Sequence, residues 1–430
     1  MDELLDTSAS NIARAIRARE VSSYEVTRAF LERIGKRDPA LNAAVQVTSE
    51  RALAEAAAAD EVLRQGAPVG PLFGVPFTAK DIFDTAGVVT AVGLEERAGF
   101  VPGQDAVVVA RLRAAGAILI AKTNCPPEGG GGVTDNPVYG RTNNPYDAAR
   151  TPGGSSGGEA ALQGAGCSPI GLGSDSGGSI RLPAHYCGVA GLKPTAGRVP
   201  STGAYGLPGG LSDVRSQVGP LSRFVEDLFP LLAVIAGPDW RDSAVVPMPL
   251  GAPEAVALKG LRVGYYEDDG LSRPTAETRA TIERVAALLA DAGAIVERAL
   301  PDLSEVWDIT RLFWRLDESS GPEVEALYRR WDGFRTDMLG FMRAYDVLIC
   351  PVDSHPAPLH DEEDPERFSY TLPYSLTGWP CIVVRAGTSP EGLPIGVQVV
   401  ARPWREDVAL AVARRIEEST GGWRPPDVVR

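Results

Sequence analysis

The sequence is poor in the side chains on which metal sites, disulfide frameworks and histidine-based hydrolases depend. Its 430 residues include five cysteines and three histidines. The cysteines are scattered, no CxxC pair occurs, and no group of cysteines and histidines has the spacing of a zinc site. We therefore expect reduced thiols and a protein that works without a metal or a cofactor.

Long apolar runs and an excess of positive charge are missing as well. The longest apolar stretch, around Leu228–Ala236, is far shorter than the roughly 20 residues that span a membrane. The first residues lack the pattern of a secretory signal. With 42 Lys and Arg against 56 Asp and Glu, the chain is a poor candidate for non-specific nucleic-acid binding. We expect a cytoplasmic protein, monomeric or homodimeric, that binds a small molecule and neither nucleic acid nor membrane.

The composition that remains is that of an ordinary globular protein. A hydrophobic share of 44% and a charged share of 23% exclude a disordered chain and a coiled coil. The sequence contains no internal repeat and no linker long enough to separate domains. We therefore predict a single domain over residues 1–430, with an N-terminal helical layer (1–66), a catalytic core (71–205) and a remainder of sheet and covering helices (206–430).

Alternating elements predict an α/β architecture with helices on both faces of a sheet. Capping residues and apolar residues at helical spacing predict helices that begin near Ser8 or Ser10, near Ser22 or Ser23 and at Thr48–Ser49, and helices over Gln104–Ala115, Gly158–Gly164, Val225–Ile235 and Thr275–Ala292. Short apolar runs predict strands at Val75–Ala79, Ile118–Lys122, Ile170–Gly173, Leu261–Tyr265, Val347–Ile349, Cys381–Val384 and Ile395–Val400.

The segment from Glu128 to Tyr205 differs from the rest because it is crowded with glycine and serine. It contains GGGG at 129–132, PGGSSGGE at 152–159 and GSDSGGSIRLP at 173–183. A single block of this kind is typical of a flexible linker. Here the blocks alternate with apolar and Arg/Pro segments that must pack, so their glycines indicate unusual backbone angles or close backbone approach.

One interpretation of this segment is a serine hydrolase of the α/β-hydrolase type. Residues 154–158 match the G-x-S-x-G elbow with Ser156 as the nucleophile, and His355 or His360 could complete a triad. Such an elbow follows a strand, whereas a turn-rich loop precedes Ser156. An esterase that uses Ser156 therefore stays open as an alternative hypothesis.

Lysine usage points to a different chemistry. The chain carries its positive charge almost wholly on arginine, and its lysines are Lys36, Lys80, Lys122, Lys193 and Lys259. Lys80 and Lys122 each end an apolar, strand-like run. Because a desolvated lysine can lose its proton and arginine cannot, these two residues are candidates for a general base.

These residues lie in blocks that resemble the amidase signature family. The run 153–195 looks like the amidase signature, and GVPFTAKD (74–81) resembles the block that holds the family's base. The runs YDVLICP (345–351), YSLTGWP (374–380) and GLPIGVQVVARP (392–403) resemble its C-terminal blocks. The resemblance is greatest to the fatty acid amide hydrolase and bacterial amidase branch. It implies a single α/β/α domain around a large mixed, twisted central sheet, without metal or cofactor.

The resemblance also implies which side chains carry the chemistry. The family's nucleophile corresponds to Ser179, its bridging serine on a cis peptide to Ser155, and its base to Lys80. The family's spacing of 24 residues between the two serines holds here. Neutral Lys80 would draw a proton from Ser155, which draws one from Ser179, and the amide would be cleaved through an acyl-enzyme. Lys122 and Lys193 would then be structural.

The turn around the predicted nucleophile supplies the remaining parts of the expected site. Asp175 and Arg181 flank this turn and are expected to hold it by an ion pair, and Ser156 is expected to support its neighbour. Backbone N–H groups of the turn could point at the oxyanion that develops on the substrate. The predicted oxyanion donors are those of Ser176, Gly177, Gly178 and Ser179.

Gly129–Gly132 stands where close relatives in the family carry bulky residues. We therefore predict a wide substrate pocket with a floor of bare backbone, and Tyr374 and Trp379 as further residues that contact the substrate. The segment between about Leu303 and Tyr345 is shorter than in many relatives, which would leave the mouth open. A wide site favours bulky or aryl amides. A carbamate has nearly the geometry of an amide, so we also expect cleavage of aryl carbamates (urethanes), and of esters.

A different role within the family stays open. The A-type chain of a tRNA-dependent amidotransferase shares these blocks and makes ammonia for its partner chains. The tetraglycine run and the short region 303–345 fit that role poorly. A non-catalytic scaffold is a further alternative, but it gives no reason for Lys80, Ser155 and Ser179 to occur together.

Overall fold

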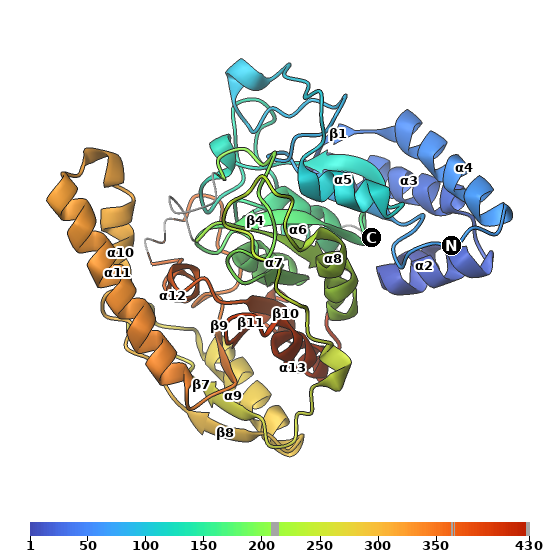
Figure 1. The fold of residues 1–430 in the computed structure, drawn as a ribbon. Coiled ribbons are helices and arrows are strands. Elements are labelled where there is room, and N and C mark those ends of the chain that lie inside the picture. Colours follow the sequence, from blue (N-terminus) through green and yellow to red (C-terminus); the bar gives the residue numbers. More distant parts are fainter. Residues whose placement is uncertain (208–214, 363, 365, 427–430) are drawn as a thin grey trace.

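A mixed sheet runs through the computed structural model, which describes residues 1–207, 215–362, 364 and 366–426 (Figure 1). In the described chain it has 11 strands: β1 (Ala44–Val47), β2 (Pro76–Lys80), β3 (Ile118–Thr123), β4 (Ile170–Asp175), β5 (Ala190–Lys193), β6 (Gln217–Ser222), β7 (Arg262–Tyr265), β8 (Ile295–Arg298), β9 (Val347–Pro351), β10 (Cys381–Thr388) and β11 (Pro394–Ala401). Their order is β1-β3-β2-β4-β6-β5-β10-β11-β9-β7-β8. β2 pairs in parallel with β3 and β4, and β7 with β8 and β9, whereas the other pairs are antiparallel. The predicted mixed α/β sheet is therefore confirmed.

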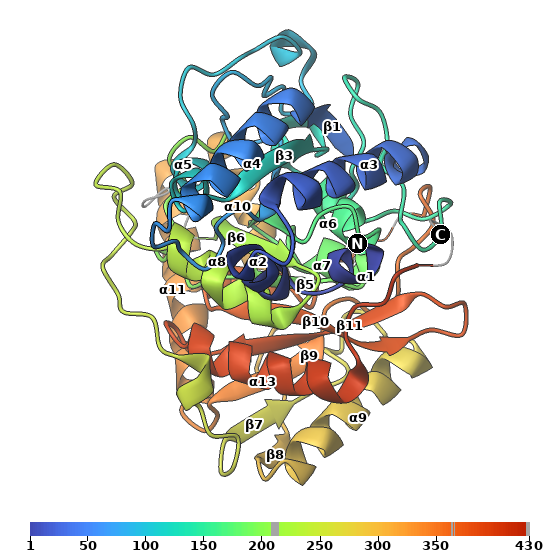
Figure 2. The ribbon, with the colours of Figure 1, turned by 90° about the vertical axis from the view of Figure 1, so that its right-hand side faces the viewer.

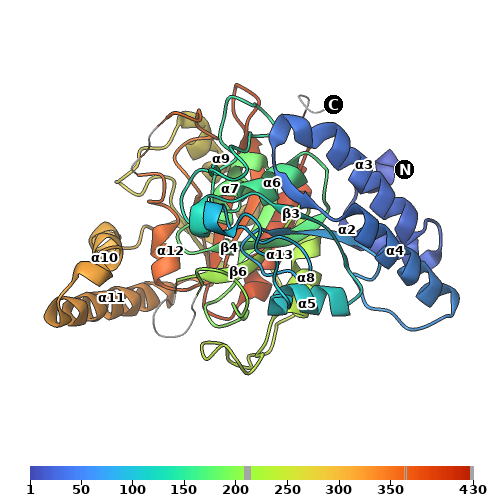
Figure 3. The same ribbon diagram turned by 90° about the horizontal axis from the view of Figure 1, so that it is seen from above.

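Helices cover both faces of this sheet (Figures 2 and 3). They are α1 (Asp2–Leu5), α2 (Ala9–Ala18), α3 (Ser23–Leu41), α4 (Ser49–Arg64), α5 (Val107–Ala114), α6 (Gly157–Gly164), α7 (Arg181–Cys187), α8 (Leu228–Ile235), α9 (Ala276–Asp291), α10 (Val306–Phe313), α11 (Gly321–Met342), α12 (Leu372–Leu376) and α13 (Glu406–Thr420). α6 packs on β2, β3 and β4, and both α7 and α13 pack on β10 and β11. Among the described residues no helix is both long and apolar enough to cross a bilayer.

The N-terminal segment folds largely as its capping residues predict. The hydroxyl of Ser8 accepts a hydrogen bond from the N–H of Asn11 at the start of α2, and Ser22 forms a reciprocal capping box with Glu25 at the start of α3. α4 follows the alanine-rich run that ends near Gly66. The segment also contributes β1, which pairs with β3 at one edge of the sheet. It is therefore more than a helical layer.

The seven runs predicted as strands are present as β2, β3, β4, β7, β9, β10 and β11. The strands that the sequence did not predict are β1, β5, β6 and β8. Three of them have four residues each, which is too short for a visible period, and β6 contains Gly219 and Pro220. β6 nevertheless lies between β4 and β5, so tertiary pairing overrides its unfavourable composition.

Two hydrophobic clusters fill the molecule. The larger one surrounds most of the sheet. The smaller one lies under α10, α11 and α12 and includes Tyr266, Trp331, Tyr370 and Trp379. In Figures 1 and 3, α10 and α11 lie on the opposite side of the molecule from α2, α3 and α4.

All five cysteines are buried and unpaired. Burial raises the pKa of the Cys125, Cys167 and Cys350 thiols to about 12, because a thiolate is poorly solvated inside the protein. The thiols are therefore protonated at neutral pH, which agrees with the expectation of reduced cysteines.

Candidate active site

The end of β2 holds Lys80, the base that the family resemblance implies. Its side chain is fully buried, and its Nζ donates to the Oγ atoms of Ser155 at 2.5 Å and Ser174 at 2.9 Å. Burial lowers the pKa of Lys80 to about 8, because a charged amine is costly away from water. A substantial neutral fraction at slightly alkaline pH allows this amine to accept a proton.

Ser155 reaches Lys80 from the loop that precedes α6. The Gly154–Ser155 peptide bond is cis, as the resemblance implied. A Cβ atom at Gly154 would lie 2.7 Å from the carbonyl oxygen of Gly131, in the tetraglycine segment (residues 129–132). Only glycine therefore allows these two loops to pass so closely. Their contact helps to place Ser155 beside Lys80.

Ser179 lies on the turn between β4 and α7. It is half-buried, whereas Lys80 and Ser155 are buried. Its carbonyl oxygen accepts a 3.1 Å hydrogen bond from the N–H of Ser156, which joins this turn to the loop that carries Ser155. Because β2 and β4 are parallel neighbours, their carboxyl ends bring Lys80 and Ser179 to the same edge of the sheet. Ser179 is the member of this set that is open to solvent.

A buried ion pair fixes this turn. Arg181 donates to Asp175 at 2.9 Å, and both side chains are fully buried. Burial alone would raise the pKa of Asp175, but the charge and hydrogen bonds of Arg181 outweigh it and lower the pKa. Asp175 also accepts from the N–H of Ile180 at 3.1 Å, and Arg181 donates to the carbonyl oxygen of Thr371 at 2.8 Å. The ion pair expected from the sequence is present and links β4, α7 and the chain before α12.

The Asp175 carboxylate also accepts a hydrogen bond from one of the four predicted oxyanion donors. The N–H of Gly178 donates to Asp175 Oδ1 at 2.8 Å. The N–H groups of Ser176, Gly177 and Ser179 have no hydrogen-bond acceptor among the described residues. In this structure the N–H of Gly178 therefore helps to hold the turn together, and the role of all four N–H groups as oxyanion donors stays a prediction.

Ser156, the nucleophile of the esterase hypothesis, is a buried residue that precedes α6 directly. Its Oγ donates to the carbonyl oxygen of Ser174 at 3.2 Å and accepts from the N–H of Ser174 at 3.3 Å. The rings of His355 and His360 bond elsewhere, to a neighbouring serine and to a backbone carbonyl. These contacts fit a supporting role for Ser156, which fixes the serine loop to β4.

The other lysines in strand-like runs are held by structural contacts. Lys122 forms a buried ion pair with Asp81 at 3.0 Å. Lys193 donates to the carbonyl oxygen of Pro194 at 3.2 Å, and burial lowers its pKa to about 8. A lowered pKa is therefore not particular to Lys80. What distinguishes Lys80 is its contact with two serine hydroxyls.

The tetraglycine segment passes beside Lys80, whose Nζ donates to the carbonyl oxygen of Gly129 at 3.3 Å. A Cβ atom at Gly130 would have no heavy atom within 4 Å, and one at Gly131 would meet only Pro126, at 3.9 Å. The middle of the segment is therefore open on the side where a side chain would stand. Its role as the floor of a substrate pocket stays a prediction.

Tyr374 and Trp379, predicted to contact the substrate, belong to the smaller hydrophobic cluster. Tyr374 is fully buried and its hydroxyl lies 2.8 Å from the hydroxyl of Tyr266, and Trp379 is 2% exposed. This packing gives no support to a substrate contact, which stays untested. Their burial beneath α10 and α11 depends on contacts between distant segments that the sequence did not reveal.

Two buried polar residues beside the site were not predicted. Ser174 is the second hydroxyl that Lys80 reaches. Glu159 accepts from the hydroxyls of Thr78 at 2.5 Å and Thr123 at 3.0 Å, and its burial raises its pKa to about 7. Glu159 therefore ties the first turn of α6 to β2 and β3. The signal for it was an acidic residue in an apolar helix directly after the two serines.

Three side chains outside this site bring possible metal ligands together. Ligand atoms of Asp353, His355 and Asp364 lie within 4.8 Å of one another. Both carboxylate oxygens of Asp353 already accept hydrogen bonds, one from the Tyr186 hydroxyl and the other from the N–H of Ser354. The cluster is therefore accounted for by packing at the end of β9.

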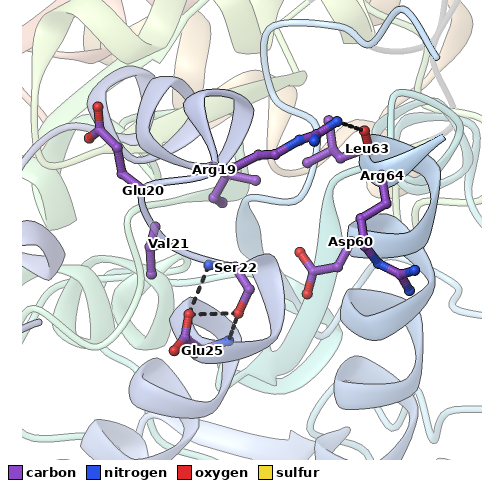
Figure 4. A pocket seen from close by; sticks show the side chains of 9 residues that line it. Arg19, Glu20, Val21, Ser22, Glu25, Asp60, Leu63 and Arg64 are labelled. Atoms are coloured by element: carbon purple, nitrogen blue, oxygen red, sulfur yellow. Dashed lines mark hydrogen bonds between the residues drawn. The ribbon is translucent and has the colours of Figure 1, made fainter. Parts of the chain in front are cut away.

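A surface hollow of about 380 Å³ lies among the N-terminal helices and is lined by residues that are distant in sequence from Ser155 and Ser179 (Figure 4). Its polar lining is used within the protein: Arg19 donates to the carbonyl oxygen of Leu63, and Ser22 and Glu25 bond each other. Asp60, on its other side, accepts from two N–H groups at the start of α3. These lining side chains therefore stabilise the ends of the N-terminal helices.

The fold and the site define a class of α/β protein in which a buried lysine contacts a serine on a cis peptide, near a second serine at the edge of the sheet. The amidase family model matches residues 25–321 and 315–410, and the chain belongs to this amidase family.

The relatives found by comparison carry different activities. The chain is 36% identical to the A-type chain of the glutamyl-tRNA(Gln) amidotransferase of Chloroflexus aggregans, over 100% of both chains. It is 35% identical to the fatty-acid amide hydrolase 2-B of Danio rerio, over 99% of this chain and 92% of that one. Its fold matches a bacterial aryl acylamidase of the amidase signature family with a TM-score of 0.84 and 25% identity, over 98% of both chains.

Proposed function

We propose that this protein hydrolyses the C–N bond of amides through Ser179, Ser155 and Lys80. The observation that carries this proposal is the 2.5 Å contact between Lys80 Nζ and Ser155 Oγ, in a buried setting that lowers the pKa of Lys80 to about 8. Membership of the amidase family supports the reaction type.

In this mechanism neutral Lys80 accepts a proton from Ser155 as Ser155 accepts one from Ser179. The Ser179 Oγ attacks the carbonyl carbon, and the oxygen of the tetrahedral intermediate becomes negative. The free N–H groups of the turn 176–179 stabilise that charge. Ser155 gives a proton to the leaving amine as Lys80 returns a proton to Ser155, the C–N bond breaks and the acyl group stays on Ser179. Water, deprotonated by the same relay, then releases the acid and regenerates the serine.

The proposed substrates are bulky or aryl amides, with aryl carbamates and esters as further ones. The open side of the tetraglycine segment supports this proposal, because Gly130 and Gly131 leave space where a side chain would stand. A carbamate presents its carbonyl to the same N–H groups as an amide, and its extra ester oxygen requires room. The likeness to an aryl acylamidase agrees with this substrate class.

A second candidate function is that of the A-type chain of an amidotransferase, which the likeness to the Chloroflexus aggregans protein favours. The two functions differ in what the isolated chain does. Turnover of anilides and aryl carbamates by the pure chain supports the amidase. Activity limited to glutamine and dependent on added partner proteins would support the alternative instead.

Variants of the two serines and the lysine separate the mechanisms. Ser179→Ala is expected to abolish turnover, and Ser155→Ala and Lys80→Ala to lower kcat by about 10²–10⁴-fold, by analogy with other triads. Ser156→Ala is the matched control and should lose less, because its hydroxyl bonds only backbone groups of Ser174. A sulfonyl fluoride should label Ser179, as peptide mapping would show. Retained activity in Ser179→Ala, with loss in a histidine variant, would overturn the proposal.

A further inference from the structure

Among the described residues, Arg367 is a buried cation without an anionic partner. Its side chain is 6% exposed, and within the described chain it donates to backbone carbonyls alone: Nη1 to Gly132 at 3.4 Å and Nη2 to Glu362 at 3.2 Å. Its Nε has no hydrogen-bond acceptor. In the part of the chain that the structure describes, no carboxylate oxygen lies within 4.0 Å of its guanidinium group.

Several other buried arginines of this protein are compensated. Arg181 and Arg198 each form a buried ion pair, with Asp175 and Glu406 respectively. Arg385, which is also 6% exposed, donates from all three of its nitrogens. A buried charge that lacks such compensation is costly. The setting of Arg367 is therefore that of a group whose partner arrives from outside the chain.

The position of Arg367 relates this cation to the proposed site. At one end of the tetraglycine segment, the carbonyl oxygen of Gly129 accepts a hydrogen bond from Lys80. At the other end, the carbonyl oxygen of Gly132 accepts one from Arg367. Between these ends Gly130 is open, with no heavy atom within 4 Å of its Cβ position. Three extended residues span roughly 10 Å at most. A substrate that lies along the segment could reach from the catalytic lysine to the guanidinium group.

We propose that Arg367 binds a carboxylate of the substrate, carried on an arm that follows the tetraglycine segment away from the scissile carbonyl. The inference rests on the proposed amidase function and adds the charge of its substrate. The planar guanidinium group matches the two oxygens of a carboxylate, and a charge-assisted hydrogen bond of this kind is about twice as strong as a neutral one. Because the segment spans roughly 10 Å at most, the arm between the scissile carbonyl and the carboxylate has up to roughly nine bonds.

Matched anilides test the charge preference of the wild-type chain. Suberanilate carries a carboxylate at the end of its acyl chain, and octananilide is a neutral analogue of the same length. For the amine side, 4-(4-acetamidophenyl)butanoate and 4-butylacetanilide form the second pair. We expect kcat/KM to favour the anionic member of one pair by about 10–100-fold, the range for a hydrogen bond between charged groups. The pair that shows this preference assigns the arm to the acyl or the amine side. Equal turnover within both pairs would overturn the proposal.

Substitution of the arginine assigns the preference to this residue. Arg367→Met should reduce the anionic-to-neutral ratio by about tenfold or more, and Arg367→Lys should retain part of it. Arg335→Met, on the exposed face of α11, is the control and should leave the ratio as in the wild type. If the anionic-to-neutral ratio of Arg367→Met stays within about twofold of the wild-type ratio, Arg367 is not the group that recognises the carboxylate. If the methionine variant does not fold, the comparison is made with Arg367→Lys.

Direct binding keeps this proposal distinct from the proposed reaction. If the wild-type chain turns over none of the four anilides, the amidase function fails, but titration calorimetry with suberate still tests the cation. Suberate should bind to the wild-type chain and bind at least about tenfold more weakly to Arg367→Met. Absence of suberate binding to the wild type, or equal binding to both chains, would overturn the assignment of Arg367.

Discussion

The rate of acylation is expected to follow the protonation state of Lys80. Burial lowers the pKa of this amine from 10.5 to about 8. Only the neutral amine can take a proton from Ser155, so kcat/KM should rise as pH increases. With a pKa of about 8, roughly a tenth of the chain is active at pH 7 and roughly nine tenths at pH 9, a rise of about tenfold. An ordinary lysine would give a rise of about 100-fold over the same interval.

Hydrolysis of 4-nitroacetanilide measures this dependence, because the released 4-nitroaniline stays uncharged across the range. Lys193→Met is the matched control, since burial also lowers the pKa of Lys193 to about 8 and, among the described residues, its Nζ donates only to a backbone carbonyl. The control should keep the same pH dependence as the wild type. A rise near 100-fold between pH 7 and pH 9, or a pH dependence that disappears in Lys193→Met, would refute the assignment of Lys80 as the base.

Further predictions concern the stability of the site and the width of the pocket. Lys80→Met should raise the free energy of unfolding by roughly 1–3 kcal/mol at pH 7, because the buried charged amine costs about 3 kcal/mol at that pH and the lost hydrogen bonds offset part of this cost. Between pH 8 and 10.5 the unfolded wild-type chain binds more protons than the folded one, so the wild type becomes more stable as pH rises. Urea titrations should therefore show that the stability gained by Lys80→Met shrinks over that range. Asp175→Asn should lower the free energy of unfolding by about 3–5 kcal/mol, because Arg181 would be left as an uncompensated buried charge; a change below about 1 kcal/mol would contradict this. Gly130→Phe should cut kcat/KM for bulky anilides at least about tenfold and spare acetamide-sized substrates; Gly130 is the better position because its φ is −109°, whereas Gly131 has a φ of 114° that a side chain would strain.

Local signals in the sequence were enough to predict much of the fold. The caps at Ser8 and Ser22 and the apolar runs of the central strands act over a few residues, so each is visible without knowledge of its neighbours. α11 and β6 depend on partners far along the chain instead. β6, for example, contains a proline and two flanking polar residues, and only its pairing between β4 and β5 makes it a central strand.

In the candidate site, too, some features could be recognised in the sequence and others depend on contacts between distant residues. Lys80, Ser155 and Ser179 were predicted because family resemblance preserves them in recognisable blocks. The contact of Ser174 with Lys80 was not, because a serine in a glycine-rich run has no pattern that indicates its partner. The bond from Gly178 to Asp175 likewise depends on how the turn closes over the carboxylate. Resemblance therefore predicts which groups could react, and coordinates are needed to see which groups are already bonded.

The burial of every native cysteine has a practical consequence for labelling. A maleimide reacts with an accessible thiolate, and these five sulfurs are both enclosed and protonated. A cysteine introduced at Asp332, whose side chain is 79% exposed on α11, would offer a reactive thiol beside five unreactive ones. A fluorescent dye at that position could report whether α10 and α11 move when substrate binds. The wild-type chain, which the maleimide does not label, is the control, and every native cysteine stays in place.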